Sequence, residues 1–252
     1  MIKTVVTAPR GHMGSLIIKA ALERDDMEIT GAVGTPGRDY IGMDAGEAAG
    51  LGKKAGAVVY DDIEDIIEGC DAVIDFSTVE LSMRVLESCR RHGKALICGT
   101  TGFTPAQSER FSEAGRDIAV MKAANTSYVV SVMKKLLGEA AVRLGERCGI
   151  DIIEMHSADK KDAPSGTAIE MAAEMAGTAD KEYGDIKFHS LRSGNTPSTH
   201  RVVFGCMGER MEISHDAYDW GCYALGACDA AVFLAGCEAG EYTMDDVTGA
   251  RE

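Results

Sequence analysis

The sequence is short of basic residues: 26 Lys and Arg stand against 40 Asp and Glu, giving a formal net charge of −14. Surfaces that bind nucleic acids or anionic membranes are normally basic, so this deficit argues against both kinds of partner. Residues 60–80 and 209–252 together carry more than the whole acidic excess, so the rest of the chain is slightly basic. A small anionic ligand remains compatible with this charge, because it needs only a locally positive pocket.

Long apolar runs are also lacking. No apolar stretch approaches the ~18 residues that a membrane span needs. The first residues, MIKTVVTAPRGHMG, lack the long apolar centre of a signal peptide. Hydrophobic residues nevertheless make up 45% of the 252 residues, enough for the core of one large domain or two small ones. We therefore expect a soluble, cytoplasmic protein.

The chain has no CxxC pair, no internal repeat and no low-complexity linker. Its eight cysteines are widely spaced, at positions 70, 89, 98, 148, 206, 222, 228 and 237. In a chain with a full hydrophobic core, this spacing favours reduced and mostly buried thiols. It argues against a structural metal site, and we predict no bound metal.

The first half alternates short apolar runs with longer amphipathic ones, which is typical of βαβ units and a parallel sheet. The strands are predicted at residues 2–7, 28–33, 72–76 and 95–98. A helix is predicted from about Ser15, and a further one over 79–92, ending at Gly93. Another begins at a capping box formed by Thr104, Pro105 and Gln107.

The pattern changes after residue 125. A long helix over 128–147 is followed by a strand at 151–155, a polar loop and a short helix. Three strands then follow without intervening helices, at residues 186–192, 201–206 and 211–214, which predicts an α+β unit with an antiparallel or mixed sheet. A last helix over 223–234 is expected to return to the first domain. We thus predict two domains: 1–125, completed by about 223–252, and 126–222.

A glycine-containing turn follows the first strand. Glycines at such a turn let the backbone approach a pyrophosphate, which the helix N-terminus then binds. The pattern is GxxGxxG with alanine in place of the first glycine; an ordinary tight turn is the alternative. The predicted cofactor-binding residues here are Ala8, Pro9, Arg10, Gly11, His12 and Met13.

The second strand lacks the terminal carboxylate that bonds the ribose hydroxyls in many dinucleotide sites. It ends instead at Gly34 and Thr35, which we assign to the cofactor site. Since a carboxylate repels the 2′-phosphate of NADP, its absence permits NADP. Three cations, Arg10, His12 and Arg38, are candidates to receive that phosphate.

Two later segments, 99–101 and 123–126, are expected at the same edge of the sheet as the glycine turn, because ligands of open α/β sheets bind there. The strand that precedes the first of these segments ends at the same edge, at Asp75-Phe76-Ser77-Thr78. Asn125 is a candidate to bond the carboxamide of a nicotinamide. The predicted cofactor-binding residues of the two segments are Gly99, Thr100 and Thr101, then Ala123, Ala124, Asn125 and Thr126.

A third motif runs from Glu154 to Thr167. His156 and Lys160 could supply an acid and a cation, since they lie four residues apart after a strand. Ser165, Gly166 and Thr167 begin a helix, whose N-terminus binds anions. A solvated loop with a surface histidine is the other interpretation of this spacing.

Over nearly its whole length the chain resembles the 4-hydroxy-tetrahydrodipicolinate reductase family of lysine and diaminopimelate biosynthesis. The most specific likeness is the K-x-DAPSGTA segment from Lys160 together with GTTGF from Gly99. Further matching segments are the PRGxMG turn, Asp44-Ala45-Gly46-Glu47, Ile74-Asp75-Phe76, Ala124-Asn125, Glu154, His189-Ser190-Leu191-Arg192, Gly194, His200, Phe204, Glu209-Arg210 and Glu212-Ile213-Ser214-His215.

The resemblance implies an α/β fold with a Rossmann-like nucleotide domain and an α+β domain that binds substrate and forms a homotetramer. It implies NADPH- or NADH-dependent reduction of a cyclic, unsaturated dicarboxylate to tetrahydrodipicolinate. By the same resemblance, His156 is the proton donor and acceptor and Lys160 the second proton-donating residue. The resemblance assigns Gly166 and Thr167 to the site for the substrate carboxylate, and we add Ser157 and Ser165 as candidate substrate-binding residues.

The chain departs from the family pattern at several positions. Ser157 stands where a second histidine is common, residues 168–191 form a short connection, and Tyr218-Asp219-Trp220 replaces a Ser-Ser-Arg-like segment. Two alternatives therefore stay open. One is a related nicotinamide-dependent oxidoreductase acting on another small carboxylic acid. The other is a catalytically silent protein that binds a dinucleotide.

Overall fold

The computed structural model describes residues 1–179 and 186–249, which form two compact units. Unit 1 comprises residues 1–127 and 221–247; unit 2 comprises residues 128–220 and, of the described residues at the end of the chain, 248–249. Each unit has its own sheet and its own buried core. Among the described residues, no helix combines the length and the apolar character needed to cross a membrane.

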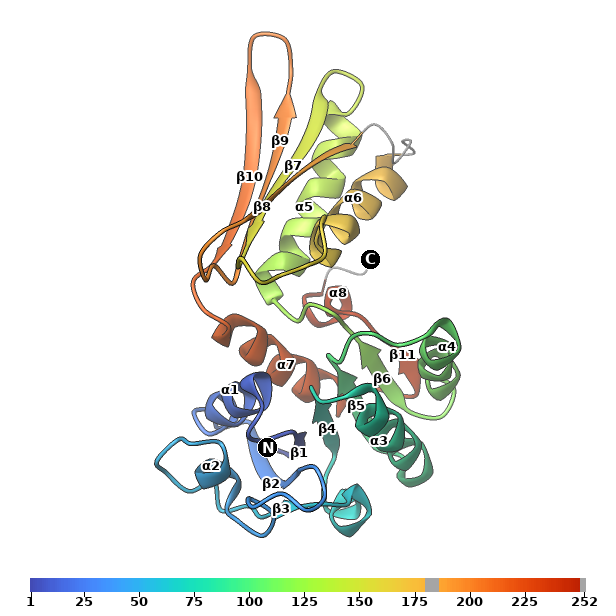
Figure 1. Cartoon of the computed structure of the whole chain (residues 1–252). Coiled ribbons are helices and arrows are strands. Elements are labelled where there is room, and N and C mark those ends of the chain that lie inside the picture. Colours follow the sequence, from blue (N-terminus) through green and yellow to red (C-terminus); the bar gives the residue numbers. More distant parts are fainter. Residues whose placement is uncertain (180–185, 250–252) are drawn as a thin grey trace. The chain divides into compact units, whose positions relative to one another are not determined.

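Unit 1 is built on a seven-stranded parallel sheet (Figure 1). In spatial order the strands are β11 (Gly240–Glu241), β6 (Ala119–Lys122), β5 (Ala95–Cys98), β4 (Ala72–Asp75), β1 (Ile2–Thr7), β2 (Met27–Val33) and β3 (Val59–Tyr60). The four central strands carry consecutive buried residues, as strands covered on both faces should. The order reverses between β1 and β4, where doubly wound sheets bind their ligands.

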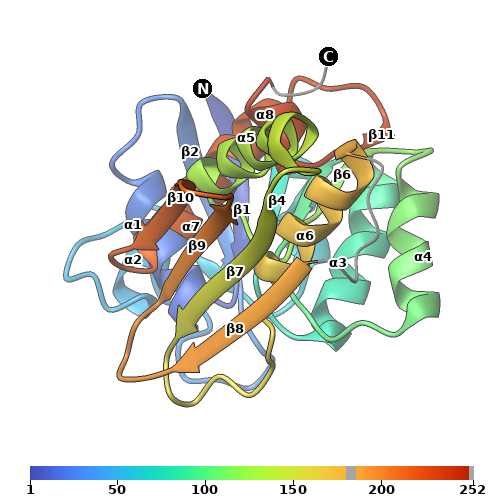
Figure 2. The same ribbon diagram turned by 90° about the horizontal axis from the view of Figure 1, so that it is seen from above.

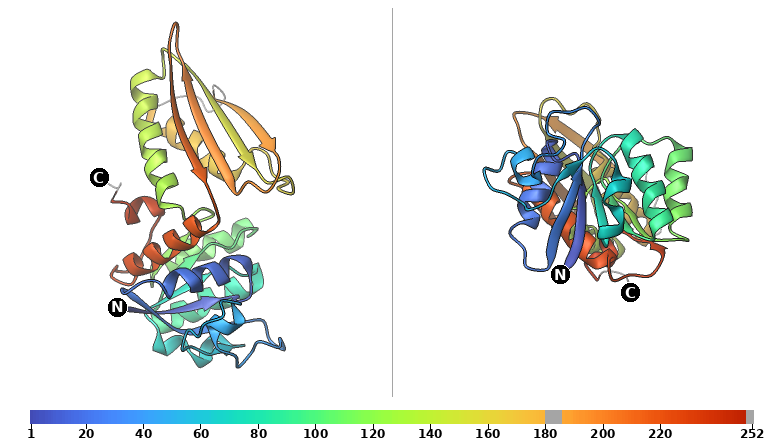
Figure 3. Two further views of the ribbon diagram at one scale, coloured as in Figure 1. Left: turned by 90° about the vertical axis from the view of Figure 1, so that its left-hand side faces the viewer. Right: turned by 90° about the horizontal axis from the view of Figure 1, so that it is seen from below.

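Helices cover both faces of this sheet (Figures 1 and 3). On one face lie α1 (His12–Ala21) and α7 (Gly221–Leu234), with the short α2 (Ala45–Ala48) and α8 (Met244–Val247) beside them. On the other face lie α3 (Val79–His92) and α4 (Pro105–Ala114). Helix α3 ends at Gly93 in the left-handed conformation, and the capping box at Thr104 begins α4. Both predicted helix boundaries are therefore confirmed.

Unit 2 has a mixed four-stranded sheet and two helices that pack on one of its faces (Figures 2 and 3). The spatial order is β10 (Arg210–Ala217), β9 (Ser198–Gly205), β7 (Gly149–His156) and β8 (Ile186–Arg192). Only β7 and β8 run parallel. The helices are α5 (Tyr128–Leu144) and α6 (Gly166–Ala179). Alternate residues of β7 and β9 are buried beneath them, as the period of two in a strand requires.

The prediction that all cysteines are reduced is wrong for one pair. Cys148 and Cys206 form a disulfide, with their Cα atoms 4.3 Å apart. The cause is strand register: Gly149 lies opposite Gly205 in the antiparallel pair of β7 and β9, so the next residues outward are neighbours. The other six cysteines are reduced; Cys222 and Cys237 are half-buried and the remaining four are buried.

Candidate active site

The glycine turn after β1 is packed against the start of α1. A Cβ atom on Gly14 would lie 2.1 Å from the carbonyl oxygen of Ala8, so the position admits only glycine. Ala8 adopts a φ of 49°, a left-handed conformation that costs a residue with a Cβ roughly 1–2 kcal/mol. This is the position where the GxxGxxG pattern has its first glycine. The turn thus keeps the shape of a dinucleotide-binding turn despite the alanine.

A fully buried carboxylate ties the strand ends together behind this turn. Asp75, the last residue of β4, accepts hydrogen bonds from Thr7 Oγ1 (2.7 Å) and Ser77 Oγ (2.5 Å). It also accepts bonds from the Ser82 hydroxyl, the Cys98 thiol and Thr100 Oγ1. These donors come from the ends of β1 and β5, from the loop after β4 and from α3. A single carboxylate therefore fixes the edge of the sheet where the predicted cofactor residues lie.

At this edge lies a hollow of about 280 Å³. A Cβ on Gly99 would lie 2.0 Å from the Phe76 ring, so glycine is required for the ring to line the hollow. The residues around it are Met13, Phe76, Ser77, Thr78, Val79, Gly99, Thr100 and Thr101. Met13, Gly99, Thr100 and Thr101 were predicted from the sequence; the four residues from Phe76 to Val79 were not assigned a role. The glycine-lined cleft and its hydroxyl groups fit a dinucleotide.

The segment after β6 is held by its own side chains. Asn125 Oδ1 accepts a 2.8 Å hydrogen bond from the Ser127 amide, and Thr126 Oγ1 donates to the Tyr223 carbonyl oxygen at 2.7 Å. Ala123 bonds through its amide to the carbonyl oxygen of Cys98, the last residue of β5. These contacts keep residues 123–126 beside the Gly99–Thr101 loop, although they also engage the Asn125 oxygen.

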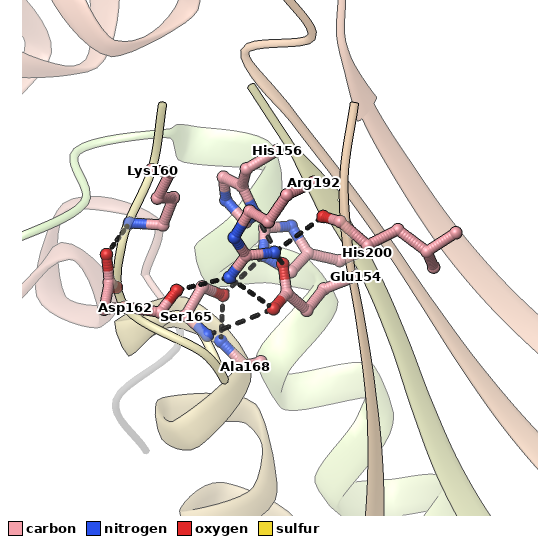
Figure 4. A network of polar contacts seen from close by, with 9 residues as sticks. Glu154, His156, Lys160, Asp162, Ser165, Ala168, Arg192 and His200 are labelled. Atoms are coloured by element: carbon pink, nitrogen blue, oxygen red, sulfur yellow. Dashed lines mark hydrogen bonds and ion pairs between the residues drawn. The ribbon is translucent and has the colours of Figure 1, made fainter. Parts of the chain in front are cut away.

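In unit 2, a second buried carboxylate organises the site (Figure 4). Glu154 and His156 lie two residues apart on β7 and hence on the same, helix-covered face of the sheet. Glu154 accepts a hydrogen bond from His156 Nδ1 at 2.5 Å. It also accepts two bonds from the Arg192 guanidinium, each 2.9 Å long. Arg192 reaches it because β8 runs parallel to β7, with Arg192 paired to His156.

These contacts set the protonation of the pair. Burial opposes ionisation of Glu154, but the bonds from Arg192, Ser190 and His156 outweigh it and hold its pKa below the ordinary value. Burial lowers the pKa of His156; Glu154 partly offsets this, while Lys160 and Arg192 add to it. Because an ionised Glu154 accepts from Nδ1–H, the other ring nitrogen, Nε2, is the one that can exchange a proton.

The start of α6 lies against the same cluster. The Ser165 amide donates to Glu154 Oε1 (3.3 Å), and its hydroxyl caps the helix by accepting from the Ala168 amide (3.2 Å). That hydroxyl also contacts His200 Nε2 at 3.3 Å. The amides of Gly166 and Thr167 therefore lie at the positive end of the helix. The Ser165 amide before them donates to Glu154, and the Ala168 amide after them donates to the Ser165 hydroxyl.

The loop between β7 and α6 carries the remaining predicted residues. Lys160 Nζ pairs with Asp162 Oδ1 at 2.9 Å, and Arg192 donates to the Asp162 carbonyl oxygen. The Lys160 amide donates to the Ser157 carbonyl oxygen, which closes a turn. Figure 4 shows Lys160 and Asp162 beside His156, Arg192 and Ser165. The loop is thus anchored by the guanidinium that also holds Glu154.

Glu154 and Arg192 were not assigned a role from the sequence. The available signal was the Glu-x-His spacing on one strand, which places both side chains on one face. Arg192 gave no such signal, because its approach depends on the pairing of β7 with β8. Within the described residues, no group of three His, Cys, Asp or Glu side chains is arranged to hold a metal ion.

Comparisons with known proteins match the whole chain. Residues 2–126 match the family model for the dihydrodipicolinate reductase N-terminus, and residues 129–248 match the model for its C-terminus. A 4-hydroxy-tetrahydrodipicolinate reductase of Geobacter sp. (strain M21) is 37% identical over all of both chains. One of Pseudomonas fluorescens (strain Pf0-1) is 39% identical over 99% of each.

A solved structure shows the same fold. The dipicolinate-bound dihydrodipicolinate reductase of Paenisporosarcina sp. TG-14 superposes with a TM-score of 0.79 at 23% identity, covering 96% of this chain and 97% of that one. The predicted Rossmann-like sheet with a second, mixed-sheet unit is thereby confirmed. On the two family models and the full-length relatives, this chain belongs to the dihydrodipicolinate reductase family.

Proposed function

We propose that this protein is the NAD(P)H-dependent reductase that converts 4-hydroxy-tetrahydrodipicolinate to tetrahydrodipicolinate in lysine and diaminopimelate biosynthesis. The observation that carries the proposal is the buried Glu154–His156–Arg192 cluster beside the start of α6. It joins a proton carrier to an anion-binding helix end. Loss of the 4-hydroxyl group as water leaves an unsaturated dicarboxylate. Its reduction requires both, because the ring then takes up a hydride and a proton while its carboxylates are held.

Unit 1 is the part of the chain that binds the cofactor in this proposal. NADH or NADPH, when bound, supplies the hydride. The turn from Ala8 to Met13 and the start of α1 hold the pyrophosphate through backbone amides. Gly99, Thr100 and Thr101 hold the nicotinamide end together with Ala123, Ala124, Asn125 and Thr126, while Gly34 and Thr35 lie at the ribose end. The Asp75 network keeps these segments in place before the cofactor arrives.

His156 is the acid in the proposal. Its lowered pKa makes its imidazolium a stronger acid than free histidine, so the proton leaves more readily. A bound dianion raises that pKa again and so favours loading of the proton on Nε2. Glu154 accepts from Nδ1–H in both protonation states and fixes the ring. Delivery of this proton to the reduced ring balances the hydride.

Substrate binding is assigned to the loop and the helix end. The amides of Gly166 and Thr167 receive one carboxylate at the positive end of α6. Lys160 adds a positive charge and a second proton-donating group, with Asp162 holding its ammonium in place. Ser157 and Ser165 contribute hydroxyl groups, and Ser165 also caps the helix. This set replaces the second histidine that the family pattern has at Ser157.

We also propose a homotetramer that acts in the cytoplasm. The sheet face of unit 2 opposite α5 and α6 carries ion pairs, Asp151 with His189 and Arg201 with Glu212. They line a hollow of about 460 Å³ together with Ile153 and Val203. Such a face suits a self-complementary contact. A scattering mass of one chain in solution would contradict the tetramer, and Val203→Asp should dissociate it.

The activity is tested by coupling the protein to a synthase that makes the substrate and following NADPH absorbance. We expect consumption of NADPH that depends on both the synthase and this protein. Binding of NADPH without turnover would favour the alternatives, a reductase of another small carboxylic acid or a silent homologue. A parallel titration of NADPH fluorescence establishes binding independently of turnover.

A further inference from the structure

The end of β2 has no space for the acidic side chain that many dinucleotide-binding domains have there. Gly34 follows the last residue of β2, and a Cβ on it would lie 2.4 Å from Cε2 of Tyr40. The Tyr40 ring is buried and packs against the core of unit 1. Its hydroxyl lies 3.4 Å from the Thr35 amide, which donates to it. Any side chain at position 34 would therefore have to displace this ring.

Asp39, in the loop that follows β2, supplies a carboxylate instead, and it forms an ion pair with Arg10 of the glycine turn. Arg10 Nη1 donates to both carboxylate oxygens of Asp39, at 2.8 and 3.1 Å. The guanidinium also lies over the Tyr40 ring, 4.9 Å from its centroid. Both residues follow neighbouring parallel strands, β1 and β2, whose ends are in register from Thr7 to Val33. The pair therefore lies where a dinucleotide domain receives the adenine ribose.

The free energies of the available contacts favour transfer of Arg10 from Asp39 to a bound phosphate. The Arg10 and Asp39 side chains are 48% and 77% exposed, and an exposed ion pair contributes only about 0–1 kcal/mol. A charge-assisted bond from a guanidinium to a phosphate contributes more, about 1.5–3 kcal/mol. A phosphate could thus take Arg10 from Asp39, although the nearby carboxylate would repel it. A ribose hydroxyl could bond to Asp39 without breaking the pair, because a carboxylate accepts several bonds.

We infer that the Arg10–Asp39 pair on the Tyr40 ring sets the nucleotide preference of this enzyme. Asp39 accepts the ribose hydroxyls of NADH, and Arg10 receives the 2′-phosphate of NADPH. Asp39 repels the 2′-phosphate of NADPH, whereas Arg10 has little effect on NADH. Because each nucleotide has one favourable partner in the pair, the unmodified chain accepts both. The inference rests on the proposed function, since it assumes that this edge of unit 1 binds a nicotinamide nucleotide.

The experiment measures binding rather than turnover. Dissociation constants of NADH and NADPH are obtained by fluorescence titration for the full chain and for Asp39→Asn, Arg10→Gln and Arg84→Gln. Calorimetry with adenosine 2′,5′-bisphosphate and adenosine 5′-monophosphate isolates the contribution of the 2′-phosphate. Arg84→Gln is the matched control, because Arg84 also forms an exposed ion pair in unit 1, with Asp62, and is not a candidate phosphate-binding residue.

We expect Asp39→Asn to tighten NADPH binding about tenfold and to weaken NADH binding several-fold. Arg10→Gln should weaken NADPH and the bisphosphate about tenfold and leave NADH within about twofold. Arg84→Gln should leave the ratio of the two constants unchanged. A ratio that stays constant in both Asp39→Asn and Arg10→Gln, or an Arg84→Gln effect equal to that of Arg10→Gln, would overturn the inference alone. Failure of the unmodified chain to bind either nucleotide would overturn the proposed function as well.

Discussion

Among the described residues, each unit buries one carboxylate completely, but the two carboxylates have different partners. Asp75 in unit 1 accepts bonds from neutral hydroxyl and thiol groups on several segments. Glu154 in unit 2 accepts from a guanidinium and an imidazole, two groups that carry or exchange protons. Neutral donors fix a backbone without adding charge, whereas charged donors also change the pKa of their neighbours. The first arrangement suits a rigid binding edge and the second suits proton transfer.

The largest expected effect is loss of the proton carrier itself. His156→Gln retains a polar side chain but cannot deliver a proton, so kcat should fall by about 10²–10⁴ with a much smaller change in KM. Steady-state kinetics in the coupled assay measure both constants. His215→Gln, on the neighbouring part of the sheet, is the control for a buried histidine. An unchanged kcat in His156→Gln would remove His156 as the acid.

Glu154→Gln tests whether the negative charge of Glu154 controls proton transfer by His156. The change removes the negative charge that raises the pKa of His156, so this pKa should fall further below its ordinary value. The pH optimum of kcat should therefore move to lower pH, with kcat at neutral pH reduced. Stability should drop by about 3 kcal/mol, because the Arg192 guanidinium loses its buried partner. A pH profile that keeps its position would refute the positioning role of Glu154.

Asp75→Asn is the matching change in unit 1. An amide offers one acceptor oxygen in place of two, so some of the hydroxyl donors lose their bonds. We expect a loss of about 2 kcal/mol in the free energy of unfolding and a higher dissociation constant for NADPH. The pH profile of kcat should stay in place, since Asp75 does not contact His156. A shift equal to that of Glu154→Gln would erase the distinction between the two carboxylates.

Between about pH 6.5 and pH 5, the pH dependence of stability should come from the buried histidines of unit 2. Burial lowers the pKa of His200 to about 3 from 6.5, and His156 and His215 are also lowered. Below about pH 6.5 these histidines therefore bind protons in the unfolded chain that they do not bind in the folded chain. Each such histidine costs about 1.4 kcal/mol per pH unit as the pH falls towards the folded pKa. Glu154 adds a loss only at lower pH, because its folded pKa lies below its ordinary value of 4.5.

Urea unfolding between about pH 6.5 and pH 5 measures this slope. His200→Gln keeps an acceptor for the Ser165 hydroxyl and removes one titrating group, so its slope should be smaller by one proton. Equal slopes in the two proteins would show that His200 is protonated in the folded state.

The smallest effect is expected at Ala8. Glycine adopts the left-handed conformation at no steric cost, so Ala8→Gly should relieve roughly 1 kcal/mol of strain, reduced by the greater freedom of glycine in the unfolded chain. The midpoint of thermal unfolding should rise slightly. A clear fall would mean that the alanine methyl group packs favourably enough to outweigh the strain.

The sequence predicted the elements whose signal is local. Strands 2–7, 95–98 and 186–192 were predicted with the bounds of β1, β5 and β8, and the capping box located the start of α4. The predicted start of the first helix, near residue 15, was late, because α1 already begins at His12 inside the glycine turn. Short strands such as β3 and β11 have two residues each and were not predicted, since they carry no periodic pattern.

What sequence could not supply was the pairing between distant elements. Cys148 meets Cys206, and Glu154 meets Arg192, only because of the register of β9 and β8 on β7. Arg10 was predicted as one of three candidates to receive a phosphate, but its ion pair with Asp39 was not predicted. The roles of His156, Lys160 and the start of α6 rest on a motif that is contiguous in sequence, which is why they could be proposed early.

The Tyr40 ring has a consequence for how this enzyme can change over evolution. Acquiring an acidic residue at position 34 requires the ring to be replaced at the same time, because the two cannot occupy one space. Residue 39, by contrast, is exposed, so a change of its charge affects the exposed ion pair with Arg10 and leaves the packing of the core in place. A shift in nucleotide preference is therefore reachable by one substitution in the loop and blocked, for a single step, at the strand end.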